Sequence, residues 1–156
     1  MKNITSIIFA TLMSAVNLLP AGATEWIGPD EKVPEKYHRM NLEKLLDENK
    51  SPVGENIKAL TIVRSERSSS LLVQVRDREP LHLHADSDIT VFLLRGEGDI
   101  WLGKHSIAVK TGDIMHIPRG VVHAYINRGA DPAVAFVVYS PAPGPRDRVL
   151  VEEKNN

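Results

Sequence analysis

The sequence predicts an all-β domain, either an antiparallel sandwich or a barrel, and three observations support this. Short segments rich in β-branched and apolar residues follow one another from residue 57 to residue 140, many with a two-residue period. Turn signals rich in glycine, proline and aspartate separate these segments. Helical periodicity is confined to one short stretch that begins near residue 42. Regularly spaced short strands with little helix are typical of β-sandwiches and barrels.

The predicted strands follow in order from residue 57. The first two span residues 57–64 and 70–76, and polar residues 65–69 join them. The later strands span residues 81–85, 89–94, 99–102, 106–110, 114–117, 123–127 and 133–140. Turns that contain glycine or proline separate them, at residues 95–98, 103–104, 111–113, 118–120 and 129–132. We therefore expect the barrel to span residues 57–140.

The first 23 residues have the pattern of a cleaved signal peptide. Lys2 provides a positive start, and residues 4–19 are largely apolar. Ala21, Gly22 and Ala23 form the small-residue site that signal peptidases recognise. The apolar stretch is short and interrupted by polar residues, which favours cleavage after Ala23 over a membrane anchor. We therefore expect a periplasmic or secreted protein.

Two segments flank the predicted barrel. Residues 24–56 are expected to form an extended arm, because of Pro29 and Pro34, followed by a short helix. Asn41 is the predicted N-cap of that helix, which ends at Asp47. Residues 141–156 begin with a proline-rich stretch that cannot continue a central strand, so we expect a C-terminal arm.

Composition excludes several classes of protein. The chain contains no cysteine, which rules out a disulfide framework, so an exported domain must rely on its hydrophobic core. Its formal net charge is −1, and basic residues form no long run. Nucleic-acid binding requires a basic face, and electrostatic membrane binding requires a basic cluster. We therefore expect neither nucleic acid nor, after signal cleavage, a membrane among the partners.

Three histidines form a candidate metal site. His82 and His84 are two residues apart, so in a strand their side chains project to the same side. About thirty residues later, a Pro-x-Gly turn at residues 118–120 reverses the chain and places His123 on the next strand. Three neutral imidazoles from two neighbouring strands can bind one face of a divalent transition metal and leave its other positions open.

These segments resemble the two motifs of the cupin superfamily. The second motif is complete, with Gly112, Pro118, Gly120, His123 and Asn127 at the family spacing. In the first motif His82, His84 and Gly96 fit, whereas Arg76 stands where the family has a glycine. The resemblance implies a double-stranded β-helix, or jelly-roll, barrel with a metal pocket. It spans about residues 57–140.

The resemblance leaves the fourth ligand open between two alternatives. Counting back from Gly96 places Ile89 at the family's glutamate position, with Asp88 one residue before it. With Ile89 there, the site contains three histidines only, as in some cupin dioxygenases. With Asp88, the site contains three histidines and one acid, as in many cupins. We favour Asp88 at or beside the metal, because Asp86 and Asp88 place carboxylates in the appropriate loop. The metal can be iron, manganese, nickel, copper or zinc.

Other residues are candidates for the surroundings of the metal. His116 precedes the Pro-x-Gly turn and is a candidate base beside the ligands. Tyr125 and Phe92 lie on or near the metal strands and are candidates for lining the pocket. Arg95 and Arg119 lie in turns and are candidates for holding a substrate carboxylate.

Two functions remain as alternatives. The first is a metal-dependent enzyme with dioxygenase-type chemistry on a small oxygen-rich or anionic substrate. The second is a non-catalytic module that binds or senses a small ligand. Cupins of this size commonly pair through an edge of the barrel, which also covers exposed strands, so we expect a homodimer.

Overall fold

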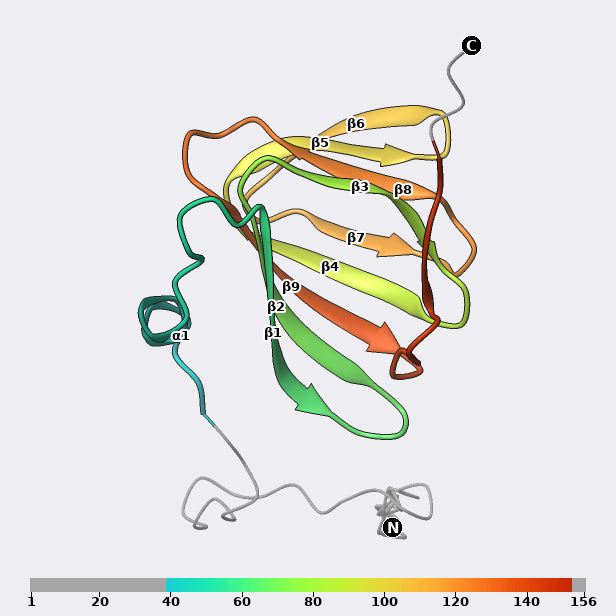
Figure 1. Cartoon of the computed structure of the whole chain (residues 1–156), viewed down its shortest axis with the longest axis horizontal. Coiled ribbons are helices and arrows are strands. Elements are labelled where there is room, and N and C mark those ends of the chain that lie inside the picture. Colours follow the sequence, from blue (N-terminus) through green and yellow to red (C-terminus); the bar gives the residue numbers. More distant parts are fainter. Residues whose placement is uncertain (1–38, 153–156) are drawn as a thin grey trace, which may run out of the picture. The chain divides into compact units, whose positions relative to one another are not determined.

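The computed structural model describes residues 39–152 of the chain (Figure 1). This part contains one short helix and ten strands, joined by turns and loops. The helix is α1 (Leu42–Glu48). The strands are β1 (Ile57–Arg64), β2 (Ser69–Val75), β3 (Arg78–His84), β4 (Asp88–Arg95), β5 (Glu97–Leu102), β6 (His105–Lys110), β7 (Ile114–Ile117), β8 (His123–Asn127), β9 (Ala133–Ser140) and β10 (Arg148–Leu150).

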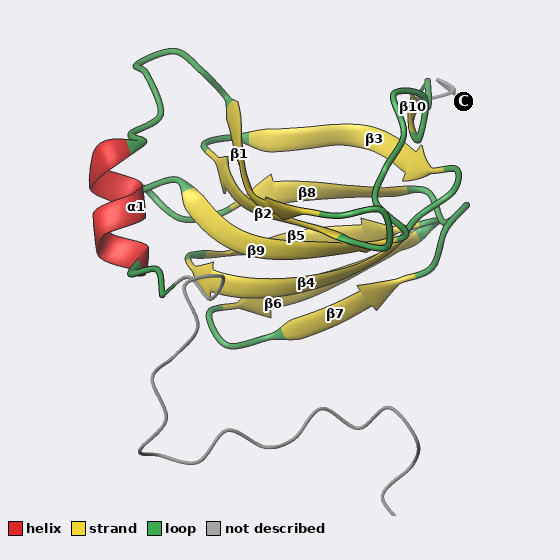
Figure 2. Ribbon diagram, turned by 90° about the horizontal axis from the view of Figure 1, so that it is seen from below, coloured by secondary structure: helices red, strands yellow, loops and turns green. Residues whose placement is uncertain are grey.

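The strands form two five-stranded sheets (Figure 2). The strand order is β1-β2-β9-β4-β7 in the first sheet and β10-β3-β8-β5-β6 in the second. All pairings are antiparallel, and strands far apart in sequence, such as β2 and β9, are direct neighbours. This arrangement is a jelly-roll, or double-stranded β-helix, so the all-β prediction is confirmed.

The core lies between the two sheets. Strand β4 shows how the sequence builds it: Ile89 and Leu93 are buried and face the core cluster, whereas Thr90 and Phe92 occupy the alternate positions. Across the core, β5 and β8 contribute Ile100 and Tyr125 to the same cluster. The two-residue period that predicted the strands therefore also determines which side chains line the interior.

Helix α1 begins where the sequence predicted. The side chain of Asn41 accepts a hydrogen bond from the backbone amide of Lys44 at 3.1 Å, as an N-cap residue does. The helix has no buried residue, and its Glu43 forms an ion pair with Arg95 at the end of β4. None of the described helices has the length and apolar character needed to cross a membrane.

The C-terminal segment differs from the predicted arm. Residues Arg148–Leu150 form β10, which pairs with β3 so that Arg148 lies opposite His84 and Leu150 opposite His82. All three β10 residues are exposed and follow a proline-rich stretch, so the sequence carries little strand signal here. The predicted signal peptide (1–23) and most of the predicted extended arm (residues 24–38) lie outside the described residues.

Candidate metal centre

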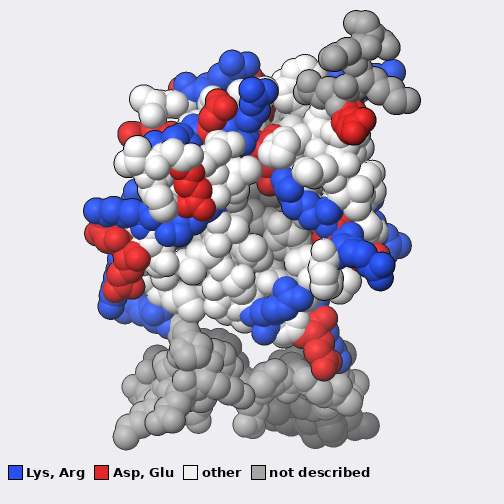
Figure 3. All heavy atoms as spheres, viewed as in Figure 1, with Lys and Arg blue, Asp and Glu red and all other residues white. Residues whose placement is uncertain are grey.

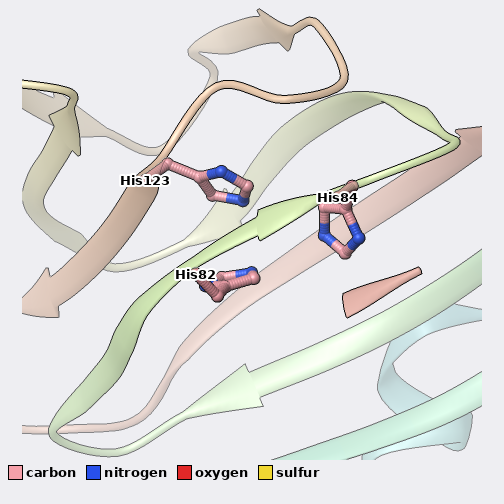
Figure 4. A group of neighbouring side chains, drawn as sticks. All are labelled: His82, His84 and His123. Carbon is pink, nitrogen blue, oxygen red and sulfur yellow. The ribbon is translucent and has the colours of Figure 1, made fainter. Parts of the chain in front are cut away.

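Three histidine rings meet inside the barrel (Figure 4). His82 and His84 come from β3, and His123 comes from β8 directly opposite His82. One ring nitrogen from each histidine lies within 4.8 Å of the others. The residues are only 1%, 4% and 4% exposed, respectively. The two-residue spacing in β3 and the pairing of β3 with β8 therefore bring together the three predicted histidines.

Each ring is oriented by a hydrogen bond at its Nδ1 atom. His82 Nδ1 lies 2.8 Å from the carbonyl oxygen of Pro80, and His123 Nδ1 lies 2.9 Å from that of Val121. His84 Nδ1 lies 2.7 Å from Oδ2 of Asp147. Because carbonyl oxygens only accept hydrogen bonds, the Nδ1 atoms of His82 and His123 carry the protons and leave the Nε2 lone pairs free. This is the tautomer that an Nε2 metal ligand requires.

The protonation equilibrium of the rings also suits a metal. Burial lowers the pKa of His82 to about 3, and neighbouring His123 lowers it further while the bond to Pro80 opposes the shift. Burial likewise lowers the pKa of His84 and of His123, despite the opposing bonds to Asp147 and Val121. All three imidazoles are therefore neutral near pH 7, as metal coordination requires.

The Pro-x-Gly turn joins β7 to β8 and is hydrogen-bonded to β3, the strand that carries His82 and His84. Gly120 has a φ of 77°, a left-handed conformation that glycine adopts without strain. Its amide donates to the carbonyl oxygen of His84 at 2.7 Å, and the amide of Val121 donates to Pro118 at 3.2 Å. The turn that precedes His123 is thus bonded directly to the strand that carries His84.

Asp147 is a part of the site that sequence reasoning missed. It is 1% exposed, and besides His84 its carboxylate accepts hydrogen bonds from the amides of Asp86 at 2.7 Å and Ser87 at 2.9 Å. These bonds lower its pKa despite the opposing effect of burial. Asp147 therefore remains ionised, orients His84 and ties the C-terminal segment to the loop after β3. No spacing pattern in the sequence relates it to the histidines.

Glu79 is a second residue that sequence reasoning missed. Its Oε1 atom lies 3.6 Å from His82 Nε2 and 3.6 Å from Arg148 Nη2. Strict alternation would place Glu79 and His82 on opposite sides of β3, but the register shifts between these residues, and both line the pocket. Burial raises the pKa of Glu79, an effect that the Arg148 guanidinium opposes.

The histidines line one part of a small pocket between the sheets, with a volume of about 70 Å³. Its other walls are mostly aliphatic, and the two tyrosines Tyr125 and Tyr139 also line it. The Tyr125 hydroxyl is buried without a hydrogen-bond partner, and burial raises its pKa. Tyr139 packs edge-on against His84. Ligand sites for drug-sized molecules are several times larger, so this pocket accommodates a ligand of only a few heavy atoms. Figure 3 shows charged side chains of both signs around an uncharged, hollowed centre of the viewed face.

The structure corrects the prediction for Asp88. Its carboxylate is not part of the histidine group, and instead Oδ1 accepts a hydrogen bond from the amide of Arg119 at 2.8 Å. The next residue, Ile89, lines the pocket and is 4% exposed. Since neighbouring residues in a strand face opposite sides, Asp88 and Ile89 cannot both point inward. Asp88 therefore fixes the Pro-x-Gly turn rather than the metal.

The remaining candidates lie away from the pocket, except Tyr125. His116 lies opposite Thr90, and its Nδ1 is 3.3 Å from the Thr90 hydroxyl on the outer side of the first sheet. Phe92 packs near Phe136, with ring centroids 6.2 Å apart, and does not line the pocket. Arg95 pairs with Glu43 of α1, and Arg119 is an exposed turn residue outside the pocket lining.

The donor set fits a divalent transition metal. Three neutral, buried imidazoles, each fixed at Nδ1, present Nε2 to a common space and satisfy the ligand preference of first-row metals. Three protein ligands leave coordination positions for water or a small molecule.

Comparisons with known proteins agree with the fold. Residues 71–139 match the family model described as "Cupin domain". An uncharacterized protein of Aquifex aeolicus (strain VF5) is 32% identical over 112 residues, 72% of this chain and 91% of that protein. The putative germin-like protein subfamily 1 member 12 of Arabidopsis thaliana is 26% identical over 120 residues, 67% of this chain and 53% of that protein.

Solved structures agree as well. The crystal structure of TT1209 from Thermus thermophilus has a TM-score of 0.59 at 26% identity, over 67% of this chain and 98% of that one. A Streptomyces PAC13 structure with uridine has a TM-score of 0.55 at 15% identity, over 62% of this chain and 78% of that one. On the family-model match, the sequence relatives and the shared fold, this chain belongs to the cupin superfamily.

Proposed function

We propose that this protein is an exported cupin that binds one divalent first-row metal through His82, His84 and His123 and acts on a small oxygen-rich or anionic substrate with dioxygenase-type chemistry. The observation that carries the metal site is the shared orientation of the three rings. Each buried ring is neutral and has its Nδ1 hydrogen-bonded, so the remaining nitrogen is available for a ligand bond.

The protein's own residues would hold the metal, shape the pocket and exclude bulk water. A bound metal would supply Lewis acidity toward a substrate oxygen and, if it is iron, reactivity toward O2. Aliphatic walls from both sheets keep the space beside the histidines apolar, which strengthens electrostatic interactions there. Asp147 maintains the orientation of His84, and Glu79 places a carboxylate beside His82.

Size restricts the substrate. A pocket of about 70 Å³ holds a short-chain molecule rather than a nucleoside such as the uridine in the PAC13 structure. We therefore favour substrates of a few heavy atoms, such as short hydroxy or oxo acids and small thiols.

A non-catalytic ligand-binding module is the second candidate. The mostly aliphatic lining of the pocket favours it, because few of the lining residues carry groups that could assist a reaction. In this case a small molecule would bind at the same histidines without chemical change.

Elemental analysis of the protein, purified without chelator, tests the proposal. We expect about one equivalent of iron, manganese, nickel, copper or zinc, and oxygen uptake with a small substrate supports the enzyme. One equivalent of metal without turnover of any small acid or thiol favours the binding module. Absence of metal, together with failure to take up Fe²⁺, Mn²⁺ or Zn²⁺ in vitro, would contradict both metal-dependent forms.

Two further proposals concern the chain outside this site. The N-terminal sequence supports export, and sequencing the N-terminus of the protein from its native compartment should show Thr24 as the first residue. The exposed edges of both sheets support a homodimer. Light scattering should then give a mass of two chains, and a mass of one chain would contradict the dimer.

A further inference from the structure

We infer that Arg148 is the anion-binding residue of the pocket and selects a small carboxylate as the ligand. This inference rests on the proposed function in that the same ligand would reach the metal histidines. Arg148 replaces Arg95 and Arg119, the predicted carboxylate anchors. None of the three arginines belongs to the pocket lining, but the ion-pair partner of Arg148, Glu79, does.

The position of Arg148 in β10 directs it to the site. Arg148 lies directly opposite His84 in the antiparallel pairing of β10 with β3, and directly paired residues project to the same side of a sheet. Its guanidinium reaches Glu79, which lines the pocket and lies 3.6 Å from His82 Nε2. Only the side chain of Glu79 therefore separates Arg148 from His82, although Arg148 is 66 positions after His82 in the sequence.

The segment that carries Arg148 is held firmly. The preceding residue, Asp147, binds His84, Asp86 and Ser87 through its carboxylate. Its carbonyl oxygen accepts a hydrogen bond from the amide of Ala85 at 2.7 Å, and beyond β10 the amide of Val151 donates to Leu81 at 3.0 Å. A guanidinium on such a fixed backbone loses less conformational freedom when it binds an anion.

No other basic residue is placed in this way within residues 39–152. The pocket lining contains neither lysine nor arginine. Of the arginines that form ion pairs in this region, Arg78, Arg95 and Arg128 pair with Asp77, Glu43 and Asp99, none of which lines the pocket. Only Arg148 pairs with a residue that does.

The Glu79–Arg148 pair leaves capacity for a ligand. The shortest nitrogen–oxygen separation is 3.6 Å, longer than the 2.7 Å of the Arg128–Asp99 pair. The side chain of Arg148 is 40% exposed and that of Glu79 is 24% exposed, so the pair lies between the pocket and solvent. A guanidinium has five donors in a planar fork that matches a carboxylate. An incoming carboxylate would compete with Glu79 for this fork.

The ligand class follows from the closeness of the two anchoring groups and the size of the pocket: one oxygen of Glu79 lies 3.6 Å from Arg148 Nη2 and 3.6 Å from His82 Nε2. Arg148 would hold the carboxylate, and a second oxygen two or three bonds away would point toward the histidines. A short 2-hydroxy or 2-oxo acid meets both conditions and fits the small pocket. Lactate is a suitable probe, and lactamide is its neutral counterpart of nearly the same shape.

Isothermal titration calorimetry of the Co²⁺-loaded full chain with lactate tests the inference. Arg148→Gln should weaken lactate binding at least tenfold, the effect typical of losing a charge-assisted hydrogen bond. Arg148→Lys should retain only part of the affinity. Glu79→Gln should instead strengthen lactate binding severalfold, because it removes the competing carboxylate. Arg128→Gln removes an arginine from a pair outside the pocket and should leave the affinity unchanged.

The outcomes separate this inference from the proposed function. Thermal unfolding and Co²⁺ stoichiometry of each variant show first that the fold and the metal site are retained. If the Arg148→Gln variant binds lactate as tightly as the unchanged protein does, the inference is overturned and the metal site still stands. The same holds if the unchanged protein binds lactamide as tightly as lactate. If no Co²⁺ binds, the proposed metal function fails, and the same titration on the metal-free protein still decides whether Arg148 binds the carboxylate.

Discussion

His84 Nδ1 lies 2.7 Å from Oδ2 of Asp147, a contact between residues that are 63 positions apart in the sequence. The other oxygen of the same carboxylate binds the amides of Asp86 and Ser87. One buried carboxylate therefore orients one ring of the candidate metal site and closes the C-terminal segment onto β3. Carboxylates that orient metal-bound histidines commonly contribute tenfold to a hundredfold to metal affinity.

Asp147→Asn should weaken metal binding about tenfold to a hundredfold. An asparagine can keep the bonds to the two amides through its oxygen, but its amide nitrogen would then face His84 Nδ1 with a second donor. His84 would have to change tautomer, which places the proton on Nε2, or rotate, which moves Nε2, and either change removes the Nε2 lone pair from the site. Competition titration against a chelating indicator measures the effect. Asp99→Asn, which alters a half-exposed ion pair outside the pocket, is the control. Equal metal affinity in the Asp147→Asn variant would show that the carboxylate does not orient the ligand.

His123→Ala should abolish stoichiometric metal binding and leave the barrel folded. Two histidines on β3 remain, and two imidazoles alone hold a divalent metal weakly. Elemental analysis and circular dichroism check both parts. His105→Ala is the matched control, since His105 is exposed at the start of β6. Full metal content in the His123→Ala variant would rule out the three-histidine site.

Asp88→Ala should keep the metal and destabilise the turn before β8. Its carboxylate accepts a hydrogen bond from the amide of Arg119, so removing it costs about 1 kcal/mol of unfolding free energy. Metal content measured beside a urea-unfolding curve separates the two effects. Loss of the metal without loss of stability would return Asp88 to the ligand set.

The histidine group could be predicted from the sequence because its geometry is local. Positions 82 and 84 are two residues apart in a strand, which places both rings on one face. The Pro-x-Gly turn determines where His123 enters the next strand. The strand boundaries follow for the same reason: β1, β7, β8 and β9 begin and end where the period and the turns predict.

The rest of the site could not be predicted, because it depends on non-local or irregular structure. Asp147 and Arg148 reach the site only through the pairing of β10 with β3, which three exposed residues do not signal. Glu79 faces the pocket because the register shifts before His82, and a two-residue period places it on the wrong side. Asp88 and Ile89 lie at the start of β4, and the family motif allowed either one to face the metal site. Only the orientation of the strand, which turns Ile89 toward the pocket, decides between them.

The metal-free protein should lose stability as the pH falls from 7.5 to 5. Burial lowers the pKa of all three site histidines, so below about pH 6.5 the unfolded chain binds protons that the folded chain excludes. Each histidine contributes a slope of up to about 1.4 kcal/mol per pH unit. The raised pKa of Glu79 makes the folded chain bind a proton more readily and so favours stability as the pH falls. This single group opposes three histidines, so the net effect remains a loss of stability. Urea unfolding across this range measures the slope. A stability that is constant over this range would show that the rings are not buried as neutral groups.

Gly98→Ala should destabilise the barrel by at least about 1–3 kcal/mol, which is typical of an overpacked core. A methyl group at Gly98 would overlap the carbonyl oxygen of Ile126 and lie 2.5 Å from the Tyr125 hydroxyl. Since Tyr125 lines the pocket, its displacement should also reduce ligand affinity. Thermal or urea unfolding gives the change in stability. Gly144→Ala is the matched control, because a methyl group there meets no atom within 4 Å. Equal stability of the two variants would contradict this prediction. It would show that β5 and β8 can move apart at Gly98 without loss of stability, so that their close approach does not hold Tyr125 in place.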